Sequence, residues 1–269
     1  MTLLPRPWSF VKDLFQQRRI IYELARHDFR SRYLGSYLGI IWAFVHPTIY
    51  ILLLWFVFQF AFKSQPVADV PFVLWLMSGI IPWFFFQDST SGAANAILGN
   101  AFLVRKMSFN LGMLPIVKII SALVIHLFFF LFLLIMLLLY GVLPSLFWLQ
   151  GFYYLMAMVL FVMGLSWVTS AIVIFLRDMN QLVTVSLQFL FWITPIFWSL
   201  TLLPPHFQQL IKLNPIVYIV QGYRESFVLN VWFWEHWMET VYFWTFTGTM
   251  LVLGAVVFRW LRPHFADVL

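Results

Sequence analysis

Long apolar stretches alternate with short charged or turn-rich segments along the whole chain. A helix needs about 20 predominantly apolar residues to cross the roughly 30 Å hydrocarbon core of a bilayer. Six stretches meet this need, at about residues 37–62, 70–96, 116–140, 147–176, 181–203 and 240–258. The pattern therefore predicts an all-α integral membrane protein, with six transmembrane helices in a single domain over residues 1–269.

Two further segments are partly apolar but do not fit a membrane span. Residues 7–33 place apolar side chains at spacings of three and four between basic ones, which is typical of an amphipathic helix on the membrane surface. Packing against a soluble partner is the alternative, and both can hold. Residues 204–230 begin with two prolines and contain several charges, so they predict short segments between spans five and six that lie at the membrane interface or fold back into the membrane.

Composition supports the membrane assignment. Hydrophobic residues make up 63% of the chain and charged residues 10%, and the mean hydropathy is +0.90. Soluble domains average about 45–50% apolar and about 25% charged residues. The chain has no cysteine, which excludes disulfides, thiolate metal sites and cysteine nucleophiles.

The basic residues predict the orientation. Seven of the 16 Lys and Arg residues precede the first predicted span, six more lie on the same side, and three lie opposite. This positive-inside bias predicts that both termini are cytoplasmic. The net charge of +6 is then mainly a topology signal, and no nucleic-acid partner is expected because the basic residues flank spans instead of forming a continuous face.

The sequence contains no recognisable catalytic or energy-coupling motif. None of the five lysines follows a glycine, so no Walker A loop is present. Asp88 is the one acidic residue near a span interior, which is weak support for an ion relay, and we expect it to be solvated or paired. His46 precedes Pro47 inside span one and fits either a structural role or a substrate contact. We expect no catalytic residue and no metal site.

Three blocks of sequence occur together. They are DFRSRYLGSYLGIIWAFVHP at 28–47, SGIIPWFFFQDSTSGAANAILGNAFLVRKMSF at 78–109, and the segment 177–227 with RDMNQ, TPIFW, LP, LNP and YRES in that order. Together these blocks resemble the permease subunits of type-2 ABC exporters for bacterial polysaccharides, as in O-antigen, capsule and teichoic acid export. Asn110 departs from the family pattern, which usually has proline there, and this affects the expected shape of the preceding loop.

The resemblance implies a partner that supplies energy. A homodimer of this chain would join two copies of a nucleotide-binding ABC ATPase, which would bind ATP and Mg, so no cofactor is expected on this chain. The complex would export an undecaprenyl-linked, O-antigen-like polysaccharide across the bacterial inner membrane. An exporter of a lipid or drug is the alternative, and an integral-membrane enzyme acting on a polyprenyl-linked sugar is a further one.

The resemblance also implies roles for three groups of residues. The ATPase-coupling candidates are Phe102, Arg105, Lys106, Met107 and Phe109, with Arg177 and Asp178 as a second docking point. The candidates for the wall of the substrate channel are Trp42, Tyr50, Trp83, Phe191, Trp192 and Trp198. Residues 204–230 would form short re-entrant helices at the outer mouth of the channel. The outer gate there would contain Lys212, Arg224 and Glu225, which we expect to pair or to meet lipid headgroups. Each group also has a plainer interpretation: the loop packs on its own protein, Arg177 and Asp178 cap helix ends, and the aromatic residues face lipid.

Overall fold

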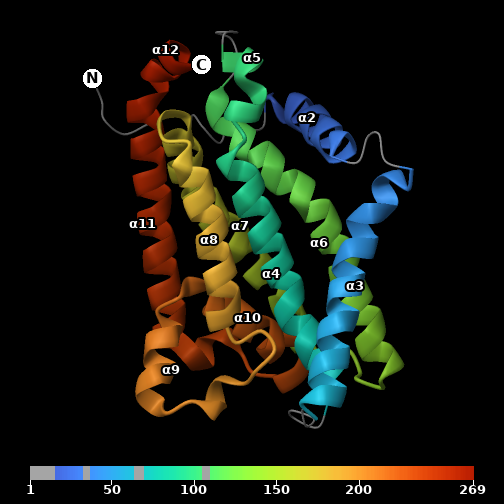
Figure 1. The fold of residues 1–269 in the computed structure, drawn as a ribbon. Helices are drawn as coiled ribbons and strands as arrows, with labels where there is room; N and C mark the ends of the chain where they lie inside the picture. The colour runs from blue at the N-terminus through green and yellow to red at the C-terminus, as the bar shows by residue number, and fades with distance from the viewer. Residues whose placement is uncertain (1–15, 33–36, 64–69, 105–109) are drawn as a thin grey trace.

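The computed structural model describes residues 16–32, 37–63, 70–104 and 110–269, and these are almost entirely helical. Long helices form a bundle, with α9 and α10 at one end and α2, α5 and α12 at the other (Figure 1). The bounds are α2 Arg18–Ser31, α3 Trp42–Phe56, α4 Phe72–Ala94, α5 Ala101–Val104, α6 Leu114–Leu139, α7 Gln150–Phe175, α8 Asp178–Ile193, α9 Pro205–Lys212, α10 Pro215–Arg224, α11 Trp237–Leu261 and α12 Phe265–Val268.

Four helical stretches in the described part of the chain are long and apolar enough to cross a membrane. They are Gly39–Ala61, Leu111–Leu139, Leu146–Phe175 and Phe233–Val268, which coincide with predicted spans one, three, four and six. The other two predicted spans are also helical. Span two is the 23-residue helix α4, whereas α8 has 16 residues and ends at Ile193, well before the predicted end of span five at 203.

The early end of α8 has a local cause. Pro195 disfavours helical backbone at the preceding residue, and Thr194 is indeed extended, with ψ of 131°. The chain then continues through non-helical residues and a short 3₁₀ turn, Leu200–Leu202, before α9. The hydropathy of the segment predicted a continuous helix because the residues after the break are as apolar as those before it.

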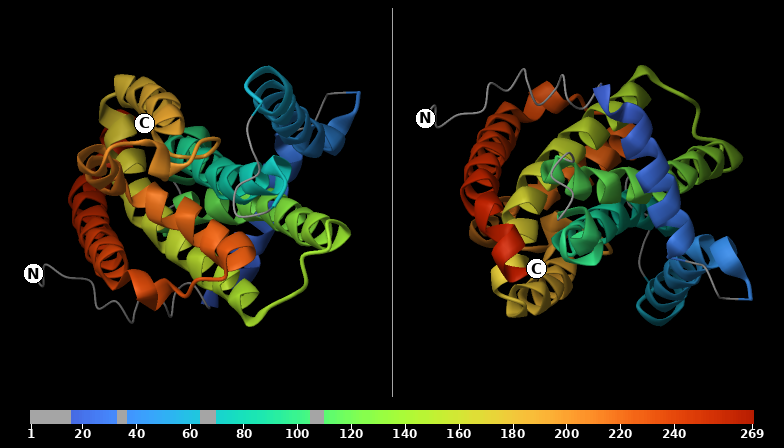
Figure 2. Two further views of the ribbon diagram at one scale, coloured as in Figure 1. Left: turned by 90° about the horizontal axis from the view of Figure 1, so that it is seen from below. Right: turned by 90° about the horizontal axis from the view of Figure 1, so that it is seen from above.

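Helix α4 forms the centre of the bundle and packs against α3, α6, α7, α8 and α10. The end-on views show it enclosed by these neighbours (Figure 2). Leu74, Leu76, Ile80 and Trp83 on α4 are fully buried. This central position also buries polar residues of α4, namely Ser78, Ser89 and Thr90, within the protein.

A close helix crossing joins α7 and α11, where two glycines meet. A Cβ atom on Gly254 would lie 2.4 Å from the carbonyl oxygen of Gly164. Small residues at such a crossing let two backbones approach closely, and this is a common way for helices to associate in membranes.

Helix α2 lies across the end of the bundle and packs on α6 (Figure 1). Ile21 and Ala25 are buried against Met113 and Val117, while Ile20 and Tyr22 on other faces stay exposed. The predicted amphipathic helix is therefore present over Arg18–Ser31.

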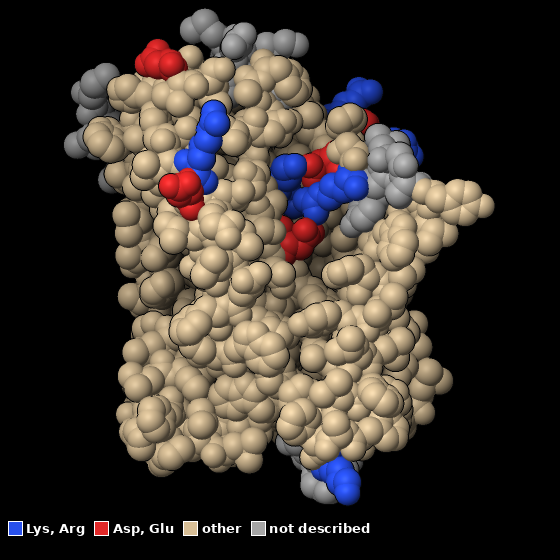
Figure 3. All heavy atoms as spheres, in the orientation of Figure 1, with Lys and Arg blue, Asp and Glu red and all other residues tan. Residues whose placement is uncertain are grey.

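Charged side chains gather at the end of the molecule that carries α2 and α5. On the face drawn in Figure 3, a broad band without Lys, Arg, Asp or Glu separates this end from a basic side chain at the opposite end. A band of this kind matches the hydrocarbon layer of a membrane.

Candidate functional site

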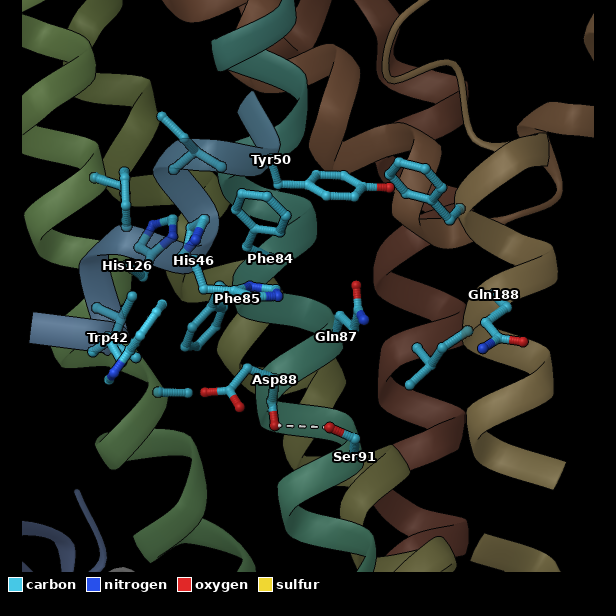
Figure 4. Close-up of a pocket in the computed structure, with 18 of the residues that line it drawn as sticks. Trp42, His46, Tyr50, Phe84, Phe85, Gln87, Asp88, Ser91, His126 and Gln188 are labelled. Carbon is cyan, nitrogen blue, oxygen red and sulfur yellow. Dashed lines mark hydrogen bonds between the residues drawn. The ribbon is translucent and has the colours of Figure 1, made fainter. Parts of the chain in front are cut away.

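A cavity of about 860 Å³ lies between α3, α4, α6 and α8 (Figure 4). Its wall combines aromatic rings with polar side chains. The aromatic residues of the wall are Trp42, Tyr50, Phe84, Phe85, Phe129, Phe191 and Trp192. The polar residues of the wall are His46, Gln87, Asp88, Ser91, His126 and Gln188.

Ring contacts hold three helices around this cavity. The Tyr50 ring on α3 lies 5.9 Å from that of Phe84 on α4 and 6.0 Å from that of Phe191 on α8, measured between centroids. Such edge-on and tilted pairs are favourable at these distances. Because Pro47 and Pro82 interrupt the hydrogen-bond ladders of α3 and α4, both helices can deviate from straight geometry beside the cavity.

The structure separates the six predicted channel residues into two groups. Trp42, Tyr50, Phe191 and Trp192 line the cavity. Trp83 is fully buried, and its Nε1 donates a hydrogen bond to Gln87 Oε1 at 2.9 Å. Trp198 lies outside the lining set, and its Nε1 donates to the Trp192 carbonyl at 3.4 Å.

Two histidines lie in the cavity wall. His46 is exposed and lines the cavity, so its position fits the contact role that the sequence left open. His126 is buried, and its Nε2 lies 3.0 Å from Tyr223 Oη on α10. Sequence reasoning did not select His126, although an imidazole in an otherwise apolar span was the available signal.

A charged cluster connects α2 to the rim of the cavity. Arg32 Nη1 donates to both carboxylate oxygens of Asp88 at 2.9 Å, and Arg32 Nη2 lies 3.1 Å from Asp28 Oδ2. Lys118 on α6 also pairs with Asp28. Asp88 is therefore paired, as the sequence predicted.

The pKa of Asp28 reflects this cluster. Burial raises the pKa of the carboxyl group, but the hydrogen bond from Lys118 and the charge of Arg32 outweigh burial. The net result is a pKa below the ordinary value for aspartate. Asp28 thus stays ionised and holds α2 to α6 near neutral pH.

Arg224 makes different contacts from those expected of an outer-gate residue. It is fully buried, and its Nη1 and Nη2 donate to the carbonyls of Pro195 and Ile196 at 2.6 and 2.5 Å. It therefore meets neither a carboxylate nor a headgroup. The guanidinium satisfies backbone carbonyls that the break after α8 leaves outside a helix.

The other two predicted gate residues contact polar partners, Lys212 in an ion pair and Glu225 beside a histidine and a tyrosine. Lys212 Nζ lies 2.9 Å from Glu239 Oε1 on α11. Glu225 Oε1 lies 3.3 Å from His236 Nε2, and Tyr154 on α7 donates to Glu225 Oε2 at 3.3 Å. These contacts attach the α9 and α10 segment to α7 and α11.

The structure describes only some of the predicted coupling residues. Arg105, Lys106, Met107 and Phe109 lie outside the described residues. Phe102 on α5 is 61% exposed. Arg177 and Asp178 are exposed at the start of α8, where a negative charge suits the helix N-terminus. Asn95 Nδ2 donates to Asn180 Oδ1 at 2.8 Å, which joins the end of α4 to the first turn of α8.

Comparison with known proteins finds similarity over most of the chain. Residues 20–228 match the family model described as ABC-2 type transporter. The O-antigen export system permease protein RfbA of Klebsiella pneumoniae is 26% identical over 253 residues, which is 93% of this chain and 95% of that protein.

Two further relatives cover similar lengths. RfbA of Myxococcus xanthus is 26% identical over 221 residues, covering 81% of this chain and 83% of that protein. The polysialic acid transport protein KpsM of Escherichia coli is 22% identical over 257 residues, covering 91% of this chain and 95% of that protein.

Proposed function

The chain belongs to the ABC-2 type transporter family, and we propose that it is the permease subunit of an ATP-driven exporter that moves a lipid-linked polysaccharide across the bacterial inner membrane. The observation that carries this proposal is the cavity of about 860 Å³ whose wall combines aromatic rings with amide, imidazole and carboxylate groups. The names of the relatives that match most of the chain support the same substrate class.

The composition of the cavity wall suits a sugar chain. Aromatic faces such as Trp42 and Trp192 can stack on the C–H faces of sugar rings. Side chains such as Gln87, Asp88 and Gln188 can exchange hydrogen bonds with hydroxyl groups. An apolar lipid or drug would form fewer hydrogen bonds with these polar side chains than a sugar chain would. The names of the relatives also do not favour an exporter of a lipid or drug.

We propose six membrane crossings, made by α3 with its π-helical extension, α4, α6, α7, α8 and α11. Helix α4 packs among five neighbouring helices, and its Gln87 and Asp88 face the cavity, which supports a crossing that contains polar side chains. Helix α8 spans only about 24 Å at 1.5 Å per residue, so the non-helical chain that follows completes its crossing. The two carbonyls held by Arg224 support this, because irregular backbone at membrane depth needs internal partners.

Helices α9 and α10 are then re-entrant helices at the outer face of the membrane. Their ion pairs to α11 and to the adjacent His236 support an attached segment at this end. Both chain termini lie on the cytoplasmic side in this arrangement, and the charges gathered around α2 and α5 fit the positive-inside rule (Figure 3).

Two copies of this chain assemble with two copies of an ABC ATPase that binds ATP and Mg. The cavity lies between α3 and α8, and Leu52 on α3 and Phe189 on α8 are both exposed, which supports a second copy that closes the channel. The ATPase docks at the α5 end. The coupling residues are Phe102, Arg105, Lys106, Met107, Phe109, Arg177 and Asp178.

Depletion of the chain in its native host tests this proposal. Loss of the permease should stop polymer from reaching the cell surface and leave lipid-linked glycan on the cytoplasmic side of the inner membrane. Restoring the chain should reverse both effects, and restoring it together with a partner ATPase that cannot hydrolyse ATP should not. A surface polymer of normal amount after depletion would contradict the proposal.

A further inference from the structure

We propose that Asp88 makes the cavity selective for glycans without charged sugars and against acidic ones. This inference rests on the proposed function and adds the chemical class of the substrate. Asp88 lies on α4 in the wall of the cavity (Figure 4), and its side chain is 39% exposed. A substrate that occupies the cavity therefore meets a carboxylate.

The nearest cation is already engaged. Both carboxylate oxygens of Asp88 accept hydrogen bonds from Arg32 Nη1 at 2.9 Å, and Arg32 also lies 3.1 Å from Asp28. Lys118 completes the cluster by pairing with Asp28. The two acidic and two basic groups make the cluster neutral as a whole. Asp88 lines the cavity, however, whereas Arg32 is not among the lining residues and its side chain is less exposed, at 22% against 39%. The group of this pair that an incoming acidic sugar contacts is therefore the carboxylate.

The other side chains of the cavity wall also favour uncharged sugars. Its hydrogen-bonding groups include the amides of Gln87 and Gln188, and within the described lining set no lysine or arginine is present. Carboxylates and amides accept hydrogen bonds from hydroxyl groups, whereas a sugar carboxylate beside Asp88 would be repelled. Pores that carry anions use arginine or lysine in their walls.

Repulsion by Asp88 has its largest effect on a polymer that carries an acidic sugar in every repeat unit. A single charged linkage at the end of a polymer passes the rim once, but an acidic sugar in each repeat brings a new negative charge past Asp88 for every repeat exported. Specificity arises from such a repulsive element as much as from favourable contacts. Asp88 is thus a specificity-determining residue as well as an anchor for α2.

A matched pair of probes tests this inference. The first probe is the polysaccharide released by mild acid from the surface of the native host, and the second is the same polysaccharide after oxidation of its primary hydroxyls to carboxylates. Binding to the complete complex with its ATPase, in lipid nanodiscs, is measured by quenching of tryptophan fluorescence, since Trp42 and Trp192 line the cavity.

We expect the wild-type complex to bind the unmodified polymer at least about tenfold more tightly than the oxidised one. Asp88→Asn should narrow this ratio to about threefold or less, and Asp88→Glu should retain it. Asp267→Asn, which removes an exposed carboxylate on α12, is the control and should leave the ratio unchanged. A merely structural role for Asp88 would weaken binding of both probes equally and leave the ratio unchanged.

Three results would overturn the inference while leaving the proposed function intact. They are a native polymer with an acidic group in every repeat, equal binding of the two probes, and an unchanged ratio in Asp88→Asn. Should Asp88→Asn fail to fold, Ser91→Asp adds a carboxylate to the same wall and must widen the ratio. If wild type binds neither probe and depletion spares the surface polymer, the proposed function itself fails.

Discussion

The guanidinium of Arg224 lies 3.9 Å from the centre of the Trp75 ring. This contact joins α10 to α4 inside the bundle, and the same guanidinium donates to two carbonyls of the chain after α8. Gly79 makes room for it, because a Cβ atom there would lie 2.9 Å from Arg224 Nη2. One buried side chain thus fixes the relative positions of three segments, at the end of the bundle that carries α9 and α10.

We expect Arg224→Lys to lower the stability of the protein strongly. A lysine carries the charge but has no planar fork, so it cannot reach both carbonyls and stack on Trp75 at once. Loss of one or more charged hydrogen bonds in a buried site costs about 3 kcal/mol. The thermal unfolding midpoint of the purified chain should fall clearly.

Lys212→Met is the matched control for this prediction. It removes a basic residue from the same outer segment, but its ion pair with Glu239 is exposed and contributes at most about 1 kcal/mol. Equal melting temperatures for Arg224→Lys and wild type would contradict the role assigned to Arg224.

Gly254→Ala should weaken the packing of α7 on α11. The added methyl group would lie 2.4 Å from the Gly164 carbonyl oxygen, so the helices must move apart. Overpacking of this kind costs about 1–3 kcal/mol. Gly248→Ala on the same helix α11 is the control, because a Cβ atom there meets nothing within 4 Å. Thermal unfolding that ranks the two variants equally would show that the close crossing is not important for stability.

Asp28→Asn should release α2 from α6 in a pH-dependent manner. The pKa of Asp28 is lowered in the folded protein, so its stabilising effect is complete above the ordinary aspartate pKa of about 3.9. That effect is lost as the pH falls from this value through the lower folded pKa. Wild type should therefore melt above Asp28→Asn at pH 7, and the difference between the two melting temperatures should shrink as the pH falls below about 3.9. A difference that persists unchanged at pH 3 would exclude the ion pairs as its cause.

Phe102→Ala should reduce association with the partner ATPase. Phe102 is exposed on α5, at the end of the molecule proposed to dock the ATPase, and apolar anchors of this kind account for much of the affinity of a helix-in-groove contact. Co-purification should fall several-fold. Phe152→Ala on α7 is the control, since Phe152 is equally exposed near the opposite end of the bundle. Equal losses in both variants would remove Phe102 from the interface.

Hydropathy alone was sufficient to predict the helical class and most helix positions. The spans with uniform apolar composition, such as α6 and α7, agree closely with prediction because every turn is apolar. The end of α8 was misplaced because hydropathy does not register the break at Pro195 inside an apolar segment. The carbonyls after this break find their partner in Arg224, 28 and 29 residues further along the chain. Such a tertiary contact leaves no periodic signal.

The sequence predicted the types of residue in the candidate site better than the positions of those residues. Aromatic channel residues were expected, but hydropathy does not tell which face of a helix points inward, so Trp83 was chosen although it is buried behind the wall. The pairing of Asp88 was expected, but its partner Arg32 lies 56 residues away and could not be identified. His126 was not selected because its partner Tyr223 lies 97 residues away, so the sequence did not show what its ring contacts.

ATP-dependent movement of glycan in inside-out vesicles of the native inner membrane tests the central claim most directly. Lipid-linked glycan on the outside of such vesicles is open to oxidation by periodate, and export moves it into the lumen. The account predicts that ATP makes the glycan periodate-resistant in vesicles that contain the chain, and that vesicles depleted of the chain show no such protection. Equal protection in both kinds of vesicle would contradict it.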